Sequence, residues 1–145
     1  MAQPDDQVAA LRAFLTSEAD EGVRLTKQLV EANRAEGIGE LVYAAFVAAV
    51  RRRFLPSWTI PDVIRFVATA RARLLDKKIT IDPGTAEILL RHTLGESIAA
   101  ELGEKARARA QIFLLSELIS DEELDVAGLD EFLTQARALA DQLIV

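Results

Sequence analysis

Apolar residues recur with the period of an α-helix in nearly every segment, and the Gly and Pro residues fall between these runs. Side chains that are three, four and seven positions apart share one face of a helix, so this spacing predicts amphipathic helices. The stretch ITID, residues 79–82, alternates like a strand, but no second strand-like run exists to pair with it. The pattern therefore predicts an all-α fold, a single compact bundle of six or seven helices with no sheet.

The segment before Gly37 carries one helix or two. Pro4 and the two acidic residues after it predict a helix start, because Pro tolerates the first turn and carboxylates favour the positive end of the helix dipole. Ser17, with the acids that follow it, is a second candidate N-cap, and Gly22 is the weak point of the pattern. One long bent helix and two shorter helices both fit residues 5–36.

The segment 38–54 is apolar on nearly all of its faces. Its main stripe follows the helical spacing closely, and Tyr43, two alanines and a valine occupy the other faces. A helix without a polar face has to be covered on all sides. We therefore expect it at the centre of the fold, ending near Phe54, because Pro56 disfavours helical geometry at Leu55.

The next helix is expected to begin between Thr59 and Pro61, after the second of two closely spaced prolines. Apolar residues recur along it at helical spacing. They are Val63, Ile64, Phe66, Val67, Ala70 and Leu74.

The two helices that follow are separated by a glycine. Asp82 is expected to cap the first of them, with Pro83 at its first position after an extended connector over residues 79–82. Gly95 is expected to stop this helix, because glycine readily adopts the left-handed conformation of a helix C-terminus. The second is expected from about Glu96 and ends in the apolar stretch IFLLSELI.

The last helix is expected to begin at the acidic stretch after residue 119. Ser120 stands three residues before Glu123, which is the spacing of a capping box. A calcium loop starting at Asp121 would need glycine at its sixth position, where Val126 stands, so we interpret the acids as a helix cap. The apolar stripe of this helix contains Leu129, Phe132, Leu133, Ala136, Leu139 and Leu143.

A chain of 145 residues, half of them hydrophobic and 6% aromatic, predicts one helical domain over residues 1–145 with a mainly aliphatic core. The absence of Cys excludes disulfides and thiolate sites. Acids near the N-terminus argue against a signal peptide, and the longest apolar run, residues 41–50, is far too short to span a membrane. We expect a soluble, cytoplasmic protein without a membrane partner.

No motif of catalysis is present in the sequence. His92 is the only histidine, so histidine metal clusters and paired Glu-x-x-His di-iron sites are excluded. We expect it at a helix end, where a cationic ring favours the dipole. Glycine-rich phosphate loops and nucleophile elbows are absent as well. The sequence therefore predicts a non-enzymatic protein with no catalytic residue, cofactor or metal.

The stretch LLRHTLGESIAAELG resembles part of a helix-turn-helix. Arg91 occupies the position where such a motif usually has a small residue. The second helix would present Glu96 and Glu101 to the phosphate backbone, which repels them. We expect no nucleic-acid partner at this segment.

Charge is unevenly distributed along the chain. The net charge is −6, yet residues 51–78, here the basic segment, carry eight basic and two acidic side chains. Such asymmetry can indicate an anionic partner. Three consecutive arginines in a helix point about 100° apart, however, and cations in a last turn complement the free carbonyls. The candidate contact residues are Arg51, Arg52, Arg53, Trp58, Arg65, Arg71 and Arg73.

Two roles remain open for these residues. The favoured one is pairing of the arginines with the protein's own acids, and the other is contact with an anionic partner. Trp58 either plugs the end of the bundle or serves as an interface anchor, since Trp and Arg are enriched in binding hot spots; we favour the plug.

The function predicted from these observations is non-enzymatic. We expect a helical protein acting through protein–protein contacts, as an adaptor, regulator or self-assembling module, with a partner that the sequence does not identify. The alternative is a binder of nucleic acid or another polyanion through the basic segment; an enzyme using carboxylates in a helical pocket is a third reading without positive support. Because residues 112–119 are apolar on more than one face, we also predict a homodimer.

Overall fold

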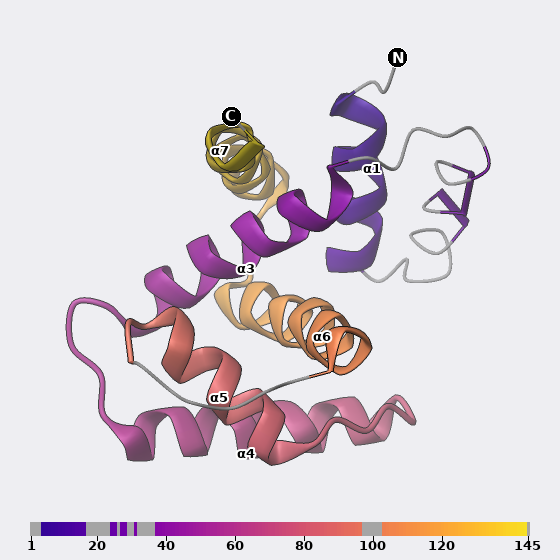
Figure 1. Ribbon diagram of the computed structural model, residues 1–145. Helices are drawn as coiled ribbons and strands as arrows, with labels where there is room; N and C mark the ends of the chain where they lie inside the picture. Colours follow the sequence, from indigo (N-terminus) through magenta and orange to yellow (C-terminus); the bar gives the residue numbers. More distant parts are fainter. Residues whose placement is uncertain are drawn as a thin grey trace.

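The computed structural model describes residues 4–16, 24, 25, 27, 28, 31, 37–96 and 103–144. All regular structure in these residues is helical, without a strand, which confirms the predicted all-α bundle (Figure 1). The helices are α1 (Pro4–Leu15), α3 (Ile38–Phe54), α4 (Ile60–Asp76), α5 (Pro83–Thr93), α6 (Glu104–Glu122) and α7 (Val126–Ile144).

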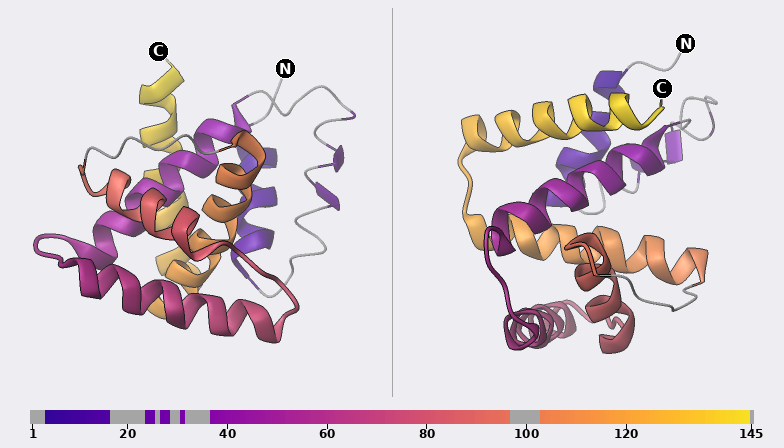
Figure 2. Two further views of the ribbon diagram at one scale, coloured as in Figure 1. Left: turned by 60° about the horizontal axis from the view of Figure 1, so that its bottom comes forward. Right: turned by 60° about the vertical axis from the view of Figure 1, so that its left-hand side comes forward.

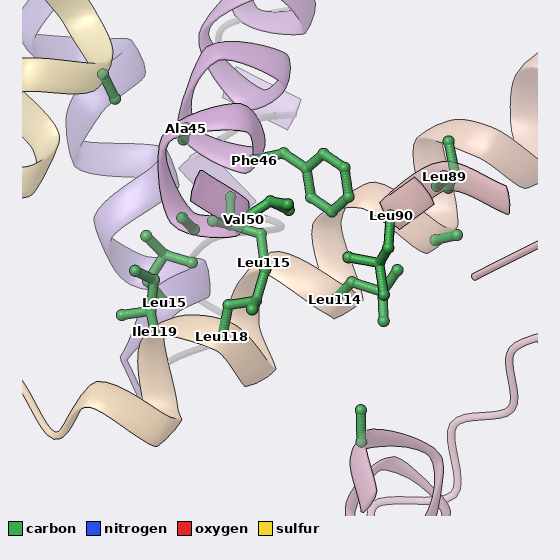
Figure 3. Packing of buried hydrophobic residues seen from close by; sticks show 14 of the residues in the cluster. Leu15, Ala45, Phe46, Val50, Leu89, Leu90, Leu114, Leu115, Leu118 and Ile119 are labelled. Carbon is green, nitrogen blue, oxygen red and sulfur yellow. The ribbon is translucent and has the colours of Figure 1, made fainter. Parts of the chain in front are cut away.

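Helix α3 lies at the centre, as its all-round apolar sequence predicts. It packs against α1, α5, α6 and α7, and Phe46 on its inner face is completely buried. Figure 3 shows Phe46, Leu90 of α5 and Leu114 of α6 facing the same interior space. The buried residues of α3 are Leu41, Ala44, Ala45, Phe46, Val47, Ala49, Val50 and Phe54.

Helix α4 lies at the edge of the molecule, on the side opposite α7 (Figures 1 and 2). It packs on α5 and α6. Its link to α3 is made by side chains at the end of that helix, where the rings of Phe54 and Phe66 meet edge to face at 5.8 Å. One long side of α4 is therefore left without a neighbouring helix within the described part of the chain.

Three helix starts and stops follow the local sequence signals. Helix α1 begins at Pro4 and α3 ends at Phe54, before an extended Leu55 that precedes a cis-proline. Asp82 caps α5, its carboxylate accepting a hydrogen bond of 2.9 Å from the Thr85 N–H. Helix α1 ends at Leu15, and the two other sites proposed for the first segment, Ser17 and Gly22, lie outside the described residues.

The expected start of α6 at about Glu96 is wrong, because Glu96 completes the end of α5. Gly95 adopts a left-handed conformation, with φ of 100°. Its N–H donates to the His92 carbonyl and the Glu96 N–H donates to the Arg91 carbonyl, each at 3.0 Å. This double closure is a Schellman motif, and α6 begins only at Glu104.

The expected capping box of the last helix is also wrong. Ser120 lies inside α6, which continues to Glu122 before Glu123 turns left-handed with φ of 49°. Asp125 caps α7 instead, with a carboxylate oxygen 2.7 Å from the Gly128 N–H. The apolar run before Ser120 keeps the chain helical past that residue, so the cap falls at the next acid able to accept the hydrogen bond.

The apolar faces of α6 are covered by the chain itself. Leu114, Leu115 and Leu118 are buried, and Ile112 and Phe113 are half-buried against the core. Most apolar side chains of residues 112–119 thus pack on the core, while Ile112 also lines a surface hollow of about 200 Å³ together with Phe14 and Val42. The homodimer stays a prediction.

We expect truncation of the central aromatic side chain to destabilise the whole bundle. Phe46→Ala removes a completely buried ring at the meeting point of three helices, so it should lower the free energy of unfolding by about 3–5 kcal/mol. Urea denaturation followed by circular dichroism measures this loss. Tyr43→Ala, on an exposed position of the same helix, is the matched control and should cost less than about 1 kcal/mol. Equal losses in the two variants would contradict the placement of α3.

Candidate functional site

A capping box fixes the start of α4 and the turn before it. The Thr59 hydroxyl accepts a hydrogen bond of 3.3 Å from the Asp62 N–H, and the Asp62 carboxylate accepts one of 2.9 Å from the Thr59 N–H. Hydrogen bonds with Thr59 and the nearby Arg65 lower the pKa of the Asp62 carboxyl below its ordinary value. This cap was not predicted, although its T-x-x-D spacing is visible in the sequence.

The three consecutive arginines at the end of α3 point to different surroundings. Arg52 forms a two-pronged ion pair with Glu122 of α6, with distances of 2.6 and 3.1 Å, and its guanidinium lies over the Phe132 ring. Arg53 lies over the rings of Phe54 and Phe66. Arg51 is exposed and makes no ion pair with any described residue. They do not form one flat cationic patch.

Each of the three arginines of α4 has a partner among the described residues. Arg65 pairs with Asp62 on its own helix at 2.5 Å. Arg73 pairs with Asp121 of α6. Arg71 donates from Nε to the backbone carbonyl of Ile81 at 3.2 Å, which is a neutral partner.

The acidic C-terminal end of α6 receives most of the inward-facing cations. Carboxylates at a helix C-terminus are disfavoured by the dipole, and Arg52 and Arg73 compensate those of Glu122 and Asp121. Four cations of the basic segment make no ion pair within the described part of the chain. Of the two acids in the segment, Asp76 likewise makes none there. These cations are Arg51, Arg53, Arg71 and Lys78.

The outward side of α4 carries a row of exposed apolar side chains. Ile60, Ile64 and Leu75 are 45%, 48% and 62% exposed. The exposed Ala68 and Ala72 continue the same helical spacing between them. These five residues are the outer row of α4 below. Ile64 is one of the apolar residues expected on this helix, and it is exposed while the other five are buried.

A surface hollow of about 290 Å³ adjoins the C-terminal half of the outer row. The extended connector forms its far wall, where Ile79 is half-buried and Ile81 is buried. Trp58, at the other end of the row, is half-buried and packs against the core. The lining residues are Ala68, Arg71, Ala72, Leu75, Ile79, Thr80 and Ile81.

A polar hollow of about 270 Å³ lies on the neighbouring side of α4. Arg53 and Arg65 line it together with Asp62 and Asp121, so cations and anions are balanced there. An anionic ligand would meet two carboxylates in this hollow, which does not favour it as a phosphate site.

A third hollow, of about 500 Å³, separates the ends of α3, α5 and α6 far from the outer row. Tyr43, Arg107 and the exposed His92 line it, the last of these in the final turn of α5 where sequence analysis placed it. No set of three His, Asp or Glu side chains within the described residues is arranged to hold a metal ion.

Glu117 of α6 is the buried carboxylate nearest α4. Only 2% of it is exposed, and Oε1 has no hydrogen-bond partner among the described residues. The nearest cations are Lys77 at 3.8 Å and Arg73 at 3.9 Å. Burial raises the pKa of Glu117 above its ordinary value, against the opposing effect of Lys77 and then Arg73, and with Asp121 adding to the rise. A carboxylate closed off from solvent cannot meet a substrate, so Glu117 does not support carboxylate catalysis.

Comparison with known proteins gives no family for this chain. No family model matches it, and no curated protein or solved structure matches it significantly. Among the described helices, none has both the length and the apolar character needed to cross a bilayer.

The buried charge of Glu117 should make stability depend on pH. Its pKa is raised in the folded state, so its contribution to the free energy of unfolding is present below about pH 4.5 and is lost as pH rises through the folded pKa. Glu117→Gln should therefore gain stability relative to the parent between pH 4 and pH 7, by about 1.4 kcal/mol for each unit of the rise. Urea unfolding at both pH values measures the difference.

The control for that measurement is Glu104→Gln, at an exposed position in the first turn of the same helix. The gain in stability on going to pH 7 should be larger for Glu117→Gln than for this control, because the Glu104 side chain is not buried. A Glu117→Gln variant that loses stability relative to the parent on going to pH 7 would contradict the account of this carboxylate.

Proposed function

We propose that the protein is non-enzymatic and acts by binding another protein through the outer row of α4. The observation that carries this proposal is the exposure of Ile60, Ile64 and Leu75 along one helix face that has no described neighbour. Contiguous apolar rows with a polar rim mark protein-binding surfaces more often than single exposed residues do. Such a surface supports a role as an adaptor or regulator.

The charged rim of the row supports the same proposal. Arg65, Arg71 and Lys78 lie beside the row. Interface cores are apolar while their rims are polar, and arginine is enriched in both binding hot spots and interfaces generally. The inward pairing of Arg52 and Arg73 favours a structural role for these two candidate contact residues over a ligand-binding one.

The alternative, a polyanion binder using the basic segment, has less support. Its three consecutive arginines point apart, and the polar hollow beside them contains two carboxylates. The unpaired Arg51 and Lys78 are the observations that favour it. They lie at opposite ends of the segment. They therefore do not form one group of cations that could neutralise neighbouring phosphates.

We expect native binding to depend on the outer row. Ile64→Glu places a charge in the middle of the row, so proteins captured from the native cell by the purified parent should be lost. A captured protein, once identified and purified, should bind the variant at least tenfold more weakly in isothermal titration calorimetry. Val126→Glu, on an exposed apolar residue of α7, is the matched control and should bind like the parent. Equal binding by the parent and Ile64→Glu would remove the outer row as the binding surface.

The polyanion alternative has its own test. Replacing Arg51, Arg52 and Arg53 together with Gln should leave nucleic-acid binding negligible, as it should be in the parent even at low salt. The same change should lower the free energy of unfolding by roughly 1–2 kcal/mol, mainly through the Arg52–Glu122 pair and the helix-end cations. Filter binding over a salt series measures the first effect. Tight, salt-sensitive binding of DNA or RNA that the triple variant abolishes would favour the alternative.

A further inference from the structure

We propose that the occupant of the outer row is an amphipathic α-helix of another protein, with acidic residues beside its apolar face. This inference rests on the proposed function and specifies its partner. The hollow between α4 and the connector is part of the same surface, since Leu75 and Ala72 belong to both. The edge position of α4 leaves this surface open (Figure 2).

The shape of the surface fits a helix. Ile60 and Leu75 are fifteen residues apart on α4, which is about 22 Å or four turns at 1.5 Å per residue. Apolar anchors spaced by one turn are the pattern that helix-in-groove recognition uses. Small side chains at Ala68 and Ala72, in the middle of the row, let a second helix approach closely. The hollow beside Leu75 then has room for a large apolar side chain of the partner.

The charge of the surface selects an acidic helix. Arg71 lies beside the row and donates a hydrogen bond to the neutral carbonyl of Ile81, so its positive charge is not neutralised by an ion pair among the described residues. Lys78 at the end of the row is likewise unpaired there, while Arg65 is balanced by Asp62. Asp76 and Asp82 are the opposing acids in this part of the surface, and Asp82 interacts electrostatically with Arg71 without forming an ion pair. Carboxylates flanking the partner's apolar face would meet Arg71 and Lys78, which raises the association rate and fixes the register.

A second copy of this chain fits the surface less well. Two α4 helices packed antiparallel about a two-fold axis at Ala68 would place Arg65 of one copy level with Arg71 of the other. The basic segment, with a net charge of +6, would then face itself. Like charges across an interface disfavour association. A nucleic acid bound through its phosphates would leave the apolar side chains of the outer row uncovered.

The test is selection of peptides on the purified full chain. A library of random 18-residue peptides displayed on phage is panned on the parent, and clones are kept if Ile64→Glu abolishes their binding. We expect the kept sequences to share apolar residues at helical spacing and a net negative charge. As synthetic peptides they should bind Ile64→Glu and Leu75→Glu at least tenfold more weakly than the parent, and Val126→Glu within twofold of it.

The acidic character is tested separately from the apolar row. Arg71→Gln combined with Lys78→Gln should slow association several-fold at low salt and reduce its salt dependence, without loss of the fold in circular dichroism. Kept peptides that are net positive, or that lack helical spacing, would overturn the inference of an acidic helix. The proposed function would survive that result if Ile64→Glu still abolished native binding.

Two further results would also overturn the inference. One is a selection that yields no peptide whose binding depends on Ile64. The other is sedimentation equilibrium in which the parent forms a dimer that Ile64→Glu dissociates, since this would assign the outer row to a second copy.

Discussion

The covering of α3 determines the rest of the structure. A helix that is apolar on nearly every face must be surrounded, and α1, α5, α6 and α7 are all used for this purpose. Helix α4 then packs on α5 and α6 at the edge, and its apolar sequence is wider than the single face that those neighbours bury. The row on α4 is thus exposed because the other helices pack around α3 and leave the outer side of α4 uncovered.

Electrostatic pairing holds the edge of the molecule to its centre. The end of α6 gathers carboxylates where the dipole disfavours them, and cations from α3 and α4 compensate this cost. The paired cations and carboxylates are about 50 to 70 residues apart in the sequence. The basic segment therefore appears in the sequence as a group of cations without nearby acidic partners. In space, four of its eight cations pair with carboxylates of the chain, and Arg71 and Lys78 lie along the outer row.

Local signals predicted most of the fold, and long-range contacts account for what they missed. Pro4, Asp82 and Gly95 act within one turn, so the sequence was sufficient to place the helix ends that they set. Ser120 failed as a cap because the apolar run before it is stabilised as helix by packing on the core. The exposure of Ile64 could not be predicted, because helical periodicity identifies apolar residues without showing which side of the helix meets the interior. The outer row could therefore be recognised only once the neighbours of α4 were known.

The separation of roles around α4 has an evolutionary consequence. Val63, Phe66, Val67, Ala70 and Leu74 secure the helix to the bundle, whereas Ile60, Ile64 and Leu75 add little to that attachment. Mutations in the second group change the free energy of unfolding less than mutations in the first, so fewer of them take the protein below the stability that folding requires. Under the proposed function, a lineage carrying this scaffold could exchange one binding specificity for another through a few substitutions on a single helix, while the folding of the chain is left intact.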